Sequence, residues 1–320
     1  MNQSLSVLKF APLLRTLPWG GRKLGELLGK TLPDERTYGE SWELSDLPEA
    51  QSQVSSGSLA GSHLADLIAT RRSDLMGECD LLQGRFPLLF KFIDARETLS
   101  VQVHPDESAC ARLGGGARPK TEAWCILHAE PGAKLYLGLV DGVGPDELRQ
   151  SLTDGSVPDL LNSVECEAGQ FFFLPAGMLH TIGEGIVLAE IQQSSDTTYR
   201  VFDWNRVGAD GKPRQLHVEQ ALACIDFSLR GQISTQSPAS GRSGLRSPFF
   251  GFERLMLSGG GLAVIDGGRP VILACIEGEC QVEAGGQRMA LGLGETCLLP
   301  ACVVGHVQSE EGCVLLLVRA

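Results

Sequence analysis

Two histidines, one glutamate and one glutamine fall within a single β-rich stretch of this sequence, at spacings that suit metal binding. Gln102 and His104 stand two residues apart in an extended run, so both side chains project from the same face of a strand. Glu122 opens a second apolar run, and His180 follows a third. Neutral imidazoles, a carboxylate and an amide oxygen suit zinc and leave room for water or a substrate oxygen. The sequence therefore predicts a metal site formed by Gln102, His104, Glu122 and His180.

Turns at the ends of these runs are expected to hold the ligands near the rim of a sheet. Pro105 cannot donate a ladder hydrogen bond, so it ends the strand immediately after His104. The segment Gly169-Gln-Phe-Phe-Phe-Leu-Pro175-Ala-Gly177-Met-Leu-His180 matches the second cupin motif position for position. A lone histidine in an apolar strand is usually structural. The prediction therefore depends on this motif and on the combination of the four ligands.

Charged residues inside apolar runs are further candidates, because a charge in such a setting needs a partner or a chemical role. Lys91 stands among phenylalanines, and Glu190 lies in the apolar run 186–193. Arg200, near the end of the next run, is a candidate to bind phosphate or stabilise an oxyanion. The alternative for Arg200 is a surface ion pair with Asp203 or Asp196.

Composition restricts the partners that the protein can have. The chain has 320 residues and a formal net charge of -12, which argues against nucleic acid or an anionic membrane as a partner. A small phosphorylated substrate remains compatible, because a few local cations suffice to bind it.

No apolar stretch approaches the roughly 20 residues of a membrane span, and the N-terminus lacks a signal pattern. Ten scattered cysteines without a CxxC pair read as reduced. These features predict a cytoplasmic protein.

The arrangement of apolar runs predicts a mainly β protein with two barrels. Residues 64–81 read as a helix or two, residues 141–162 as a helical insertion, and residues 231–246 as a linker. The expected division is a metal-binding catalytic domain at 1–230 and a smaller barrel at 247–320.

The smaller barrel repeats the motif of the first one without its histidine. Residues 294–305 reproduce the pattern of residues 169–180, but Gly305 stands where His180 does. His306 comes one position late, and a slip of one residue turns a side chain to the other face of a strand. The second barrel is therefore predicted to lack metal ligands and to have a structural or site-covering role.

Taken together, these segments resemble type I mannose-6-phosphate isomerase, in particular the shorter bacterial form. The resemblance covers most of residues 10–225. It rests on Trp19-Gly-Gly21, Gly39-Glu-Ser-Trp-Glu43, Leu99-Ser-Val-Gln-Val-His-Pro-Asp-Glu107, Lys120-Thr-Glu-Ala-Trp124, Pro175-Ala-Gly-Met-Leu-His180, Thr198-Tyr-Arg-Val-Phe202 and Arg214-Gln-Leu-His217. It implies two cupin-like jelly-roll barrels with a small helical insertion, and one zinc ion per chain held by His104, Glu122, His180 and Gln102.

The family resemblance also implies a reaction, the interconversion of mannose 6-phosphate and fructose 6-phosphate through an enediol. Arg200 matches the catalytic arginine, Lys120 a lysine beside the sugar, and Glu190 a carboxylate proposed for proton transfer. Lys91, Lys120 and Arg200 are the expected substrate contacts. The general base and the oligomeric state stay open.

Two other functions remain as alternatives at this point. One is a metal-cupin oxygenase that uses iron, which would leave Lys120, Glu190 and Arg200 unexplained. The other is a non-catalytic cupin that binds sugar phosphates, against which the full ligand set beside Arg200 argues. Bound zinc without iron would exclude the first, and aldose-ketose turnover would exclude the second.

Overall fold

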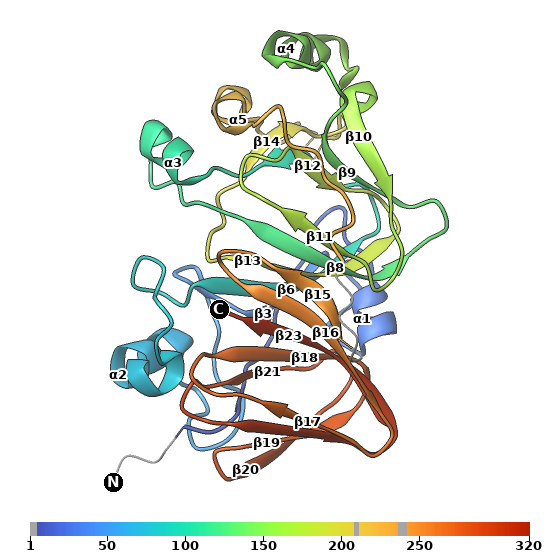
Figure 1. Cartoon of the computed structure of the whole chain (residues 1–320). Helices are drawn as coiled ribbons and strands as arrows, with labels where there is room; N and C mark the ends of the chain where they lie inside the picture. Colours follow the sequence, from blue (N-terminus) through green and yellow to red (C-terminus); the bar gives the residue numbers. More distant parts are fainter. Residues whose placement is uncertain (1–4, 208–210, 236–241) are drawn as a thin grey trace.

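The fold is mainly β, as predicted from the sequence. The structure is a computed structural model that describes residues 5–207, 211–235 and 242–320. Figure 1 shows two β-rich halves stacked on each other, with most of the helices around the upper one. All of the ladders between the named strands are antiparallel.

The half that carries the predicted ligands consists of two sheets. The six-stranded sheet has the order β11 (Phe171–Leu174), β8 (Glu122–Ala129), β13 (Ile186–Gln193), β6 (Leu88–Ala95), β3 (Glu40–Leu44), β2 (Leu13–Arg15). The five-stranded sheet has the order β10 (Leu161–Glu165), β9 (Lys134–Leu139), β12 (His180–Ile182), β7 (Val101–Val103), β14 (Tyr199–Phe202). Strand β3 is followed in the chain by a separate short hairpin, which consists of β4 (Asp46–Leu47) and β5 (Ala50–Gln51).

The second half is also a pair of sheets. The six-stranded one has the order β1 (Leu8–Lys9), β21 (Thr296–Leu299), β18 (Val271–Gly278), β23 (Gly312–Arg319), β16 (Gly251–Ser258), β15 (Arg242–Arg246). The four-stranded one has the order β17 (Gly261–Ile265), β22 (Gly305–Ser309), β19 (Cys280–Ala284), β20 (Gln287–Leu291).

Strands β6, β8 and β13 are buried on both faces, which explains why they read as continuous apolar runs. One face of β6, with Phe90 and Phe92, belongs to a core that also contains Phe252 and Leu316 of the second half. The rings of Phe90 and Phe252 are 6.4 Å apart and meet edge to face. The large sheets of the two halves therefore pack against each other through this shared core.

The opposite face of the same strands points into the upper half. Because side chains alternate along a strand, the residues that share this face are Lys91 on β6, Glu122 and Trp124 on β8, and Glu190 on β13. The register places Lys91 opposite Glu190 and Glu190 opposite Trp124. The polar residues of three central strands thus lie in one row inside the barrel.

The helices cover the edges of the sheets. They are α1 (Lys23–Leu28), α2 (Leu64–Met76), α3 (Glu107–Leu113), α4 (Pro145–Asp154) and α5 (Val218–Cys224), with a 3-10 turn η1 (Val157–Leu160). The predicted helix in residues 64–81 corresponds to α2, and the predicted insertion at 141–162 contains α4 and η1. None of the described helices is long and apolar enough to cross a membrane.

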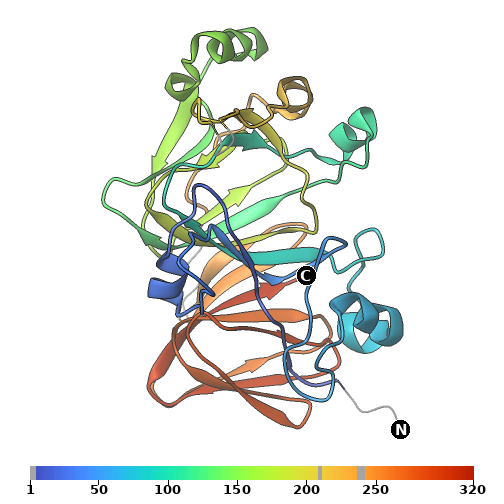
Figure 2. The same cartoon turned by 180° about the vertical axis from the view of Figure 1, so that it is seen from behind.

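The predicted domain limits, 1–230 and 247–320, stay a prediction. At one end, β1 near the N-terminus pairs with β21, so the first described residues belong to the sheet of the second half. Figure 2 shows this N-terminal segment running along both halves. At the other end, residues 242–246 of the predicted linker 231–246 form β15, and residues 236–241 lie outside the described part.

Candidate active site

Three of the four predicted metal ligands meet inside the upper half. His104 Nε2 lies 3.4 Å from Glu122 Oε2, and His180 Nε2 lies 3.2 Å from Glu122 Oε1. The three ligand atoms offered by His104, Glu122 and His180 lie within 4.8 Å of one another, and the residues are buried. Within the described residues, no other such cluster of histidine, cysteine and carboxylate side chains exists. The predicted positions therefore converge as a group that could hold a metal ion.

Backbone carbonyls fix the orientation of both imidazoles. His104 Nδ1 lies 2.9 Å from the carbonyl oxygen of Thr197, and His180 Nδ1 lies 2.9 Å from that of Met178. Each Nδ1 therefore carries the proton and donates it, so each Nε2 presents a lone pair toward Glu122. Burial, reinforced by the charge of Lys120, lowers the pKa of His104 to about 3. A neutral imidazole is the form that binds a metal ion.

One tight turn ties two of the ligand segments together. Gly177 has a φ of 89°, a left-handed conformation that disfavours a residue with a Cβ. Its N–H donates to the carbonyl oxygen of His104 at 2.9 Å. The Pro-Ala-Gly turn thus holds the strand that begins at His180 close to the end of the strand that precedes His104.

The Glu122 carboxylate is the most unusual group of the site. It is completely buried, and neither of its oxygens accepts a hydrogen bond within the described part of the chain. Lys120 Nζ lies 2.8 Å from Oε2 as an ion pair. Burial is the largest effect and opposes ionisation, but the charge of Lys120 and the two imidazoles together outweigh it and hold the pKa of Glu122 well below its usual range. A buried carboxylate with unused lone pairs fits the donor set of a metal site.

Gln102 lies next to this group but is less central. Its amide nitrogen is 3.4 Å from His180 Nε2, and the residue pairs with His180 across β7 and β12. Rotation of the amide exchanges nitrogen for oxygen, so the same position suits a weak ligand.

Among its described residues, the second half has no equivalent site. Gly305 begins β22, where its counterpart His180 begins β12, and His306 points away from the barrel interior and is exposed. The one-residue slip predicted from the sequence therefore does turn His306 to the outer face.

A chain of alternating charges extends from the ligands along the sheet. Lys120 Nζ lies 3.7 Å from Glu190 Oε1, and Lys91 Nζ lies 3.0 Å from the same oxygen. Trp124 Nε1 donates to Glu190 Oε2 at 2.9 Å. Burial and the nearby charge of Glu122 raise the pKa of Glu190, although both lysines act in the opposite direction. A carboxylate with a raised pKa beside an ammonium group is suited to proton transfer.

Arg200 lies across the barrel from this chain. Its Nε donates to Ser100 Oγ at 3.2 Å and its Nη1 to the Gln215 carbonyl oxygen at 2.9 Å. The predicted alternative, an ion pair with Asp203 or Asp196, does not occur. Asp203 binds Arg206 and Arg214 instead, at 2.6 and 2.7 Å. Arg200 therefore keeps its charge without a carboxylate partner among the residues that the structure describes.

These groups line one cavity of about 740 Å³ between the two sheets of the upper half. Predicted residues in its wall are Lys91, Gln102, Lys120, Glu190 and Arg200. The wall also contains residues that the sequence analysis did not assign to the site: Arg15, Glu40, Trp42, Ser100 and Asp196. The resemblance segment around Glu40 and Trp42 was a signal for two of them, but no motif marked Arg15.

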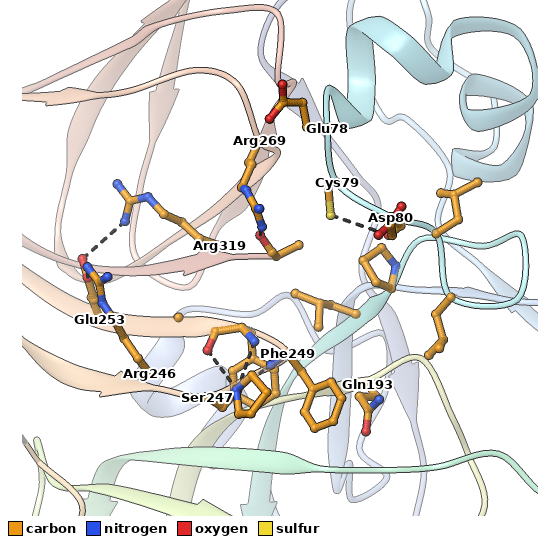
Figure 3. Close-up of a pocket in the computed structure, with 18 residues that line it drawn as sticks. Glu78, Cys79, Asp80, Gln193, Arg246, Ser247, Phe249, Glu253, Arg269 and Arg319 are labelled. Atoms are coloured by element: carbon orange, nitrogen blue, oxygen red, sulfur yellow. Dashed lines mark hydrogen bonds and ion pairs between the residues drawn. The ribbon is translucent and has the colours of Figure 1, made fainter. Parts of the chain in front are cut away.

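A second cavity, of about 470 Å³, lies on the other side of the large sheet, where the two halves meet. Figure 3 shows Cys79, Phe249 and several arginines around it. Arg319 pairs with Glu253 at 3.3 Å, and Arg269 donates to the Ala320 carbonyl oxygen at 2.9 Å. These arginines already have partners. Among the described residues, the second cavity therefore lacks the two features found at the first, a group of candidate metal ligands and an unpaired cation.

Comparison with known proteins bears on the fold and on the family. A family model described as phosphomannose isomerase type I, catalytic domain, matches residues 7–123. The mannose-6-phosphate isomerase of Streptococcus mutans is 37% identical over 289 residues, which is 88% of each chain. Mannose-6-phosphate isomerase ManA of Bacillus subtilis is 34% identical over 317 residues, 93% of this chain and 98% of that protein.

The chain belongs to the type I phosphomannose isomerase family. The crystal structure of mannose 6-phosphate isomerase from Bacillus subtilis agrees with this membership over the whole chain. It matches with a TM-score of 0.88 at 28% identity and covers 99% of this chain and 100% of its own. The resemblance stated from short motifs is thus confirmed, and the two-barrel fold is that of the family.

Proposed function

We propose that this protein is a zinc-dependent isomerase that interconverts mannose 6-phosphate and fructose 6-phosphate. The observation that carries the proposal is the buried His104, Glu122 and His180 group, whose neighbours Lys120 and Gln102 line a cavity together with glutamate and arginine side chains. Membership of the phosphomannose isomerase family supports the substrate. The catalytic and substrate-binding roles below are part of the proposal.

The metal would be held by His104, Glu122 and His180, with Gln102 as a weaker fourth ligand. The mixture of imidazole nitrogen and carboxylate oxygen suits zinc, and the orphaned oxygens of Glu122 fit a cation. When bound, the ion supplies Lewis acidity toward substrate oxygens and orients the sugar.

The protein side chains then handle protons and charge. Conversion of the aldose to the ketose removes a proton from C2 and delivers one to C1, while the hydroxyl proton passes from O2 to O1. Glu190 and Lys120, 3.7 Å apart, are placed to take and return these protons. Arg200, which pairs with no described carboxylate, stabilises the negative charge of the enediolate. Lys91 remains a candidate donor to a substrate oxygen, although two carboxylates already hold it.

A coupled assay of fructose 6-phosphate formation tests this proposal. The purified protein is assayed as prepared, after chelation and after zinc restoration, and its metal is determined by elemental analysis. We expect one zinc per chain and activity that chelation removes and zinc restores. His180→Ala should lose both metal and turnover, whereas Arg200→Ala should keep the metal and lose turnover. A folded, zinc-loaded protein without turnover would overturn the substrate assignment, and iron in place of zinc would favour an oxygenase.

A further inference from the structure

Most of the cations in the catalytic cavity are already neutralised by carboxylates. Lys91 pairs with Glu40 and Glu190, at 3.5 and 3.0 Å. Lys120 pairs with Glu122 at 2.8 Å, and Arg214 binds the Asp203 carboxylate through two of its nitrogens. Two cations remain in the cavity wall for which the described residues supply no carboxylate partner, Arg15 and Arg200. A dianionic ligand would be attracted to these two first.

Arg15 carries a hydrogen-bond donor that no described residue uses, and its guanidinium lies over an aromatic ring. Its Nε is buried and has no hydrogen-bond acceptor among the described residues. Its guanidinium carbon lies 4.5 Å from the centre of the Trp42 ring. Stacking on an indole fixes the guanidinium plane and leaves its N–H edge free to bind phosphate with two hydrogen bonds. A buried donor without an acceptor is costly, so an acceptor from a ligand would remove that cost.

The two unpaired arginines lie at different distances from the predicted metal site. Arg200 is paired in register with Gln102, which is itself next to His180. Arg15 is on β2, and strands β3, β6 and β13 separate it from β8, which carries Glu122. At about 4.8 Å between neighbouring strands, this is roughly 19 Å along the sheet and less across the curved barrel.

The substrate of the proposed reaction likewise has one end at which the reaction takes place and another that carries a permanent charge. Charge develops at C1 and C2, whereas the permanent charge is at the other end of the six-carbon chain. Trp42 joins the two regions, because Lys91 Nζ lies 5.9 Å from the ring that Arg15 covers, and Lys91 contacts Glu190. Arg200 therefore lies at the reacting end, and Arg15 lines the same cavity beyond Trp42, farther from the predicted metal site.

We propose that Arg15 binds the phosphate group of the sugar phosphate and so selects phosphorylated over free sugars. The assignment rests on the proposed function for the identity of the sugar. The interaction itself requires only an anion with phosphate chemistry. Trp42 acts as the positioning residue that holds the guanidinium in the cavity wall.

Steady-state kinetics of Arg15→Gln in the zinc-loaded full chain tests the proposal. Gln keeps part of the side chain over the ring and removes the charge. We expect KM for mannose 6-phosphate, and the inhibition constant of inorganic phosphate, to rise by about 10- to 100-fold, the effect of losing charge-assisted hydrogen bonds. We expect kcat to change by less than about 3-fold, because Arg15 is far from the reacting carbons. Arg15→Lys should restore part of the affinity.

Arg36→Ala is the matched control, since it removes one positive charge from an exposed arginine paired with Asp34. It should leave KM, kcat and phosphate inhibition unchanged. Unchanged KM and phosphate inhibition in a folded Arg15→Gln would overturn the proposal, and so would a loss of kcat at unchanged KM. If the wild type shows no turnover, the proposed function fails. Calorimetric titration with inorganic phosphate then decides about Arg15 separately, because binding must weaken in Arg15→Gln but not in Arg36→Ala.

Discussion

Replacement of Lys91 by methionine should destabilise the folded protein by about 3–5 kcal/mol. Lys91 is buried, with 9% of its side chain exposed, and it is held between Glu190 at 3.0 Å and Glu40 at 3.5 Å. Methionine fills a similar volume without the charge. The change therefore removes the cation and leaves two buried carboxylates behind.

The magnitude follows from the two distances. At an effective dielectric constant of about 20, a unit charge pair at these separations interacts with roughly 5 kcal/mol. Dehydration of the lysine in the wild type offsets part of this gain. Glu190 also keeps the Trp124 hydrogen bond and the more distant Lys120, which limits the loss. These terms place the expected cost within the range measured for broken buried ion pairs.

The cost should also depend on pH. Burial raises the pKa of Glu190, and loss of Lys91 raises it further because a cation that favoured the carboxylate is gone. A group whose pKa is higher in the folded than in the unfolded chain weakens folding at high pH. This penalty is relieved as pH falls through the folded pKa. The stability difference between Lys91→Met and wild type should therefore shrink as the pH falls through the raised pKa of Glu190 in the folded variant.

Urea unfolding at a series of pH values, with the same excess of zinc in every sample, measures the effect. Lys134→Met is the control, because Lys134 is an exposed residue at the start of β9 and should change stability by less than about 0.5 kcal/mol. The double variant Lys91→Met, Glu190→Gln should be more stable than Lys91→Met alone, since one uncompensated charge is removed. A loss below about 1 kcal/mol, or one independent of pH, would refute the argument.

Two further substitutions test other parts of the structure. Asp203→Asn removes the partner of Arg214, and we expect a loss of about 1–3 kcal/mol at pH 7. Burial raises the pKa of Asp203, but the hydrogen bonds from its arginines outweigh it and lower the pKa overall. The stabilisation is therefore present above the unfolded pKa and lost as pH falls through the folded value, so the difference from wild type should vanish in acid. Gly39→Ala should cost about 1–3 kcal/mol in urea unfolding, because a Cβ would lie 2.6 Å from the Trp19 ring. Gly251→Ala, where a Cβ meets nothing within 4 Å, is its control and should be nearly neutral.

The sequence by itself was enough to identify the family and to predict three residues that meet in the structure as a group that could hold a metal ion. His104, Glu122 and His180 occur at strand ends, where the chain's own local signals place them: the period of two, Pro105 and the turn at Gly177. Such signals act over a few residues, so they can be recognised in the sequence before the fold is known. The same local logic predicted that His306 lies on the wrong face, and the structure confirms its exposure.

Only the tertiary structure decided which charged groups neutralise one another. Lys91 and Glu40 are 51 residues apart, and Glu190 comes from a third strand. Their contact depends on the order of strands in the sheet, which no local pattern encodes. The pairing of β2 with β3 placed Arg15 over Trp42, and the course of the chain after β14 paired Asp203 with Arg206 and Arg214 rather than with Arg200. Charged groups pair according to their positions in space. The two cavity cations without a described carboxylate partner, Arg15 and Arg200, can therefore be identified only from the tertiary structure.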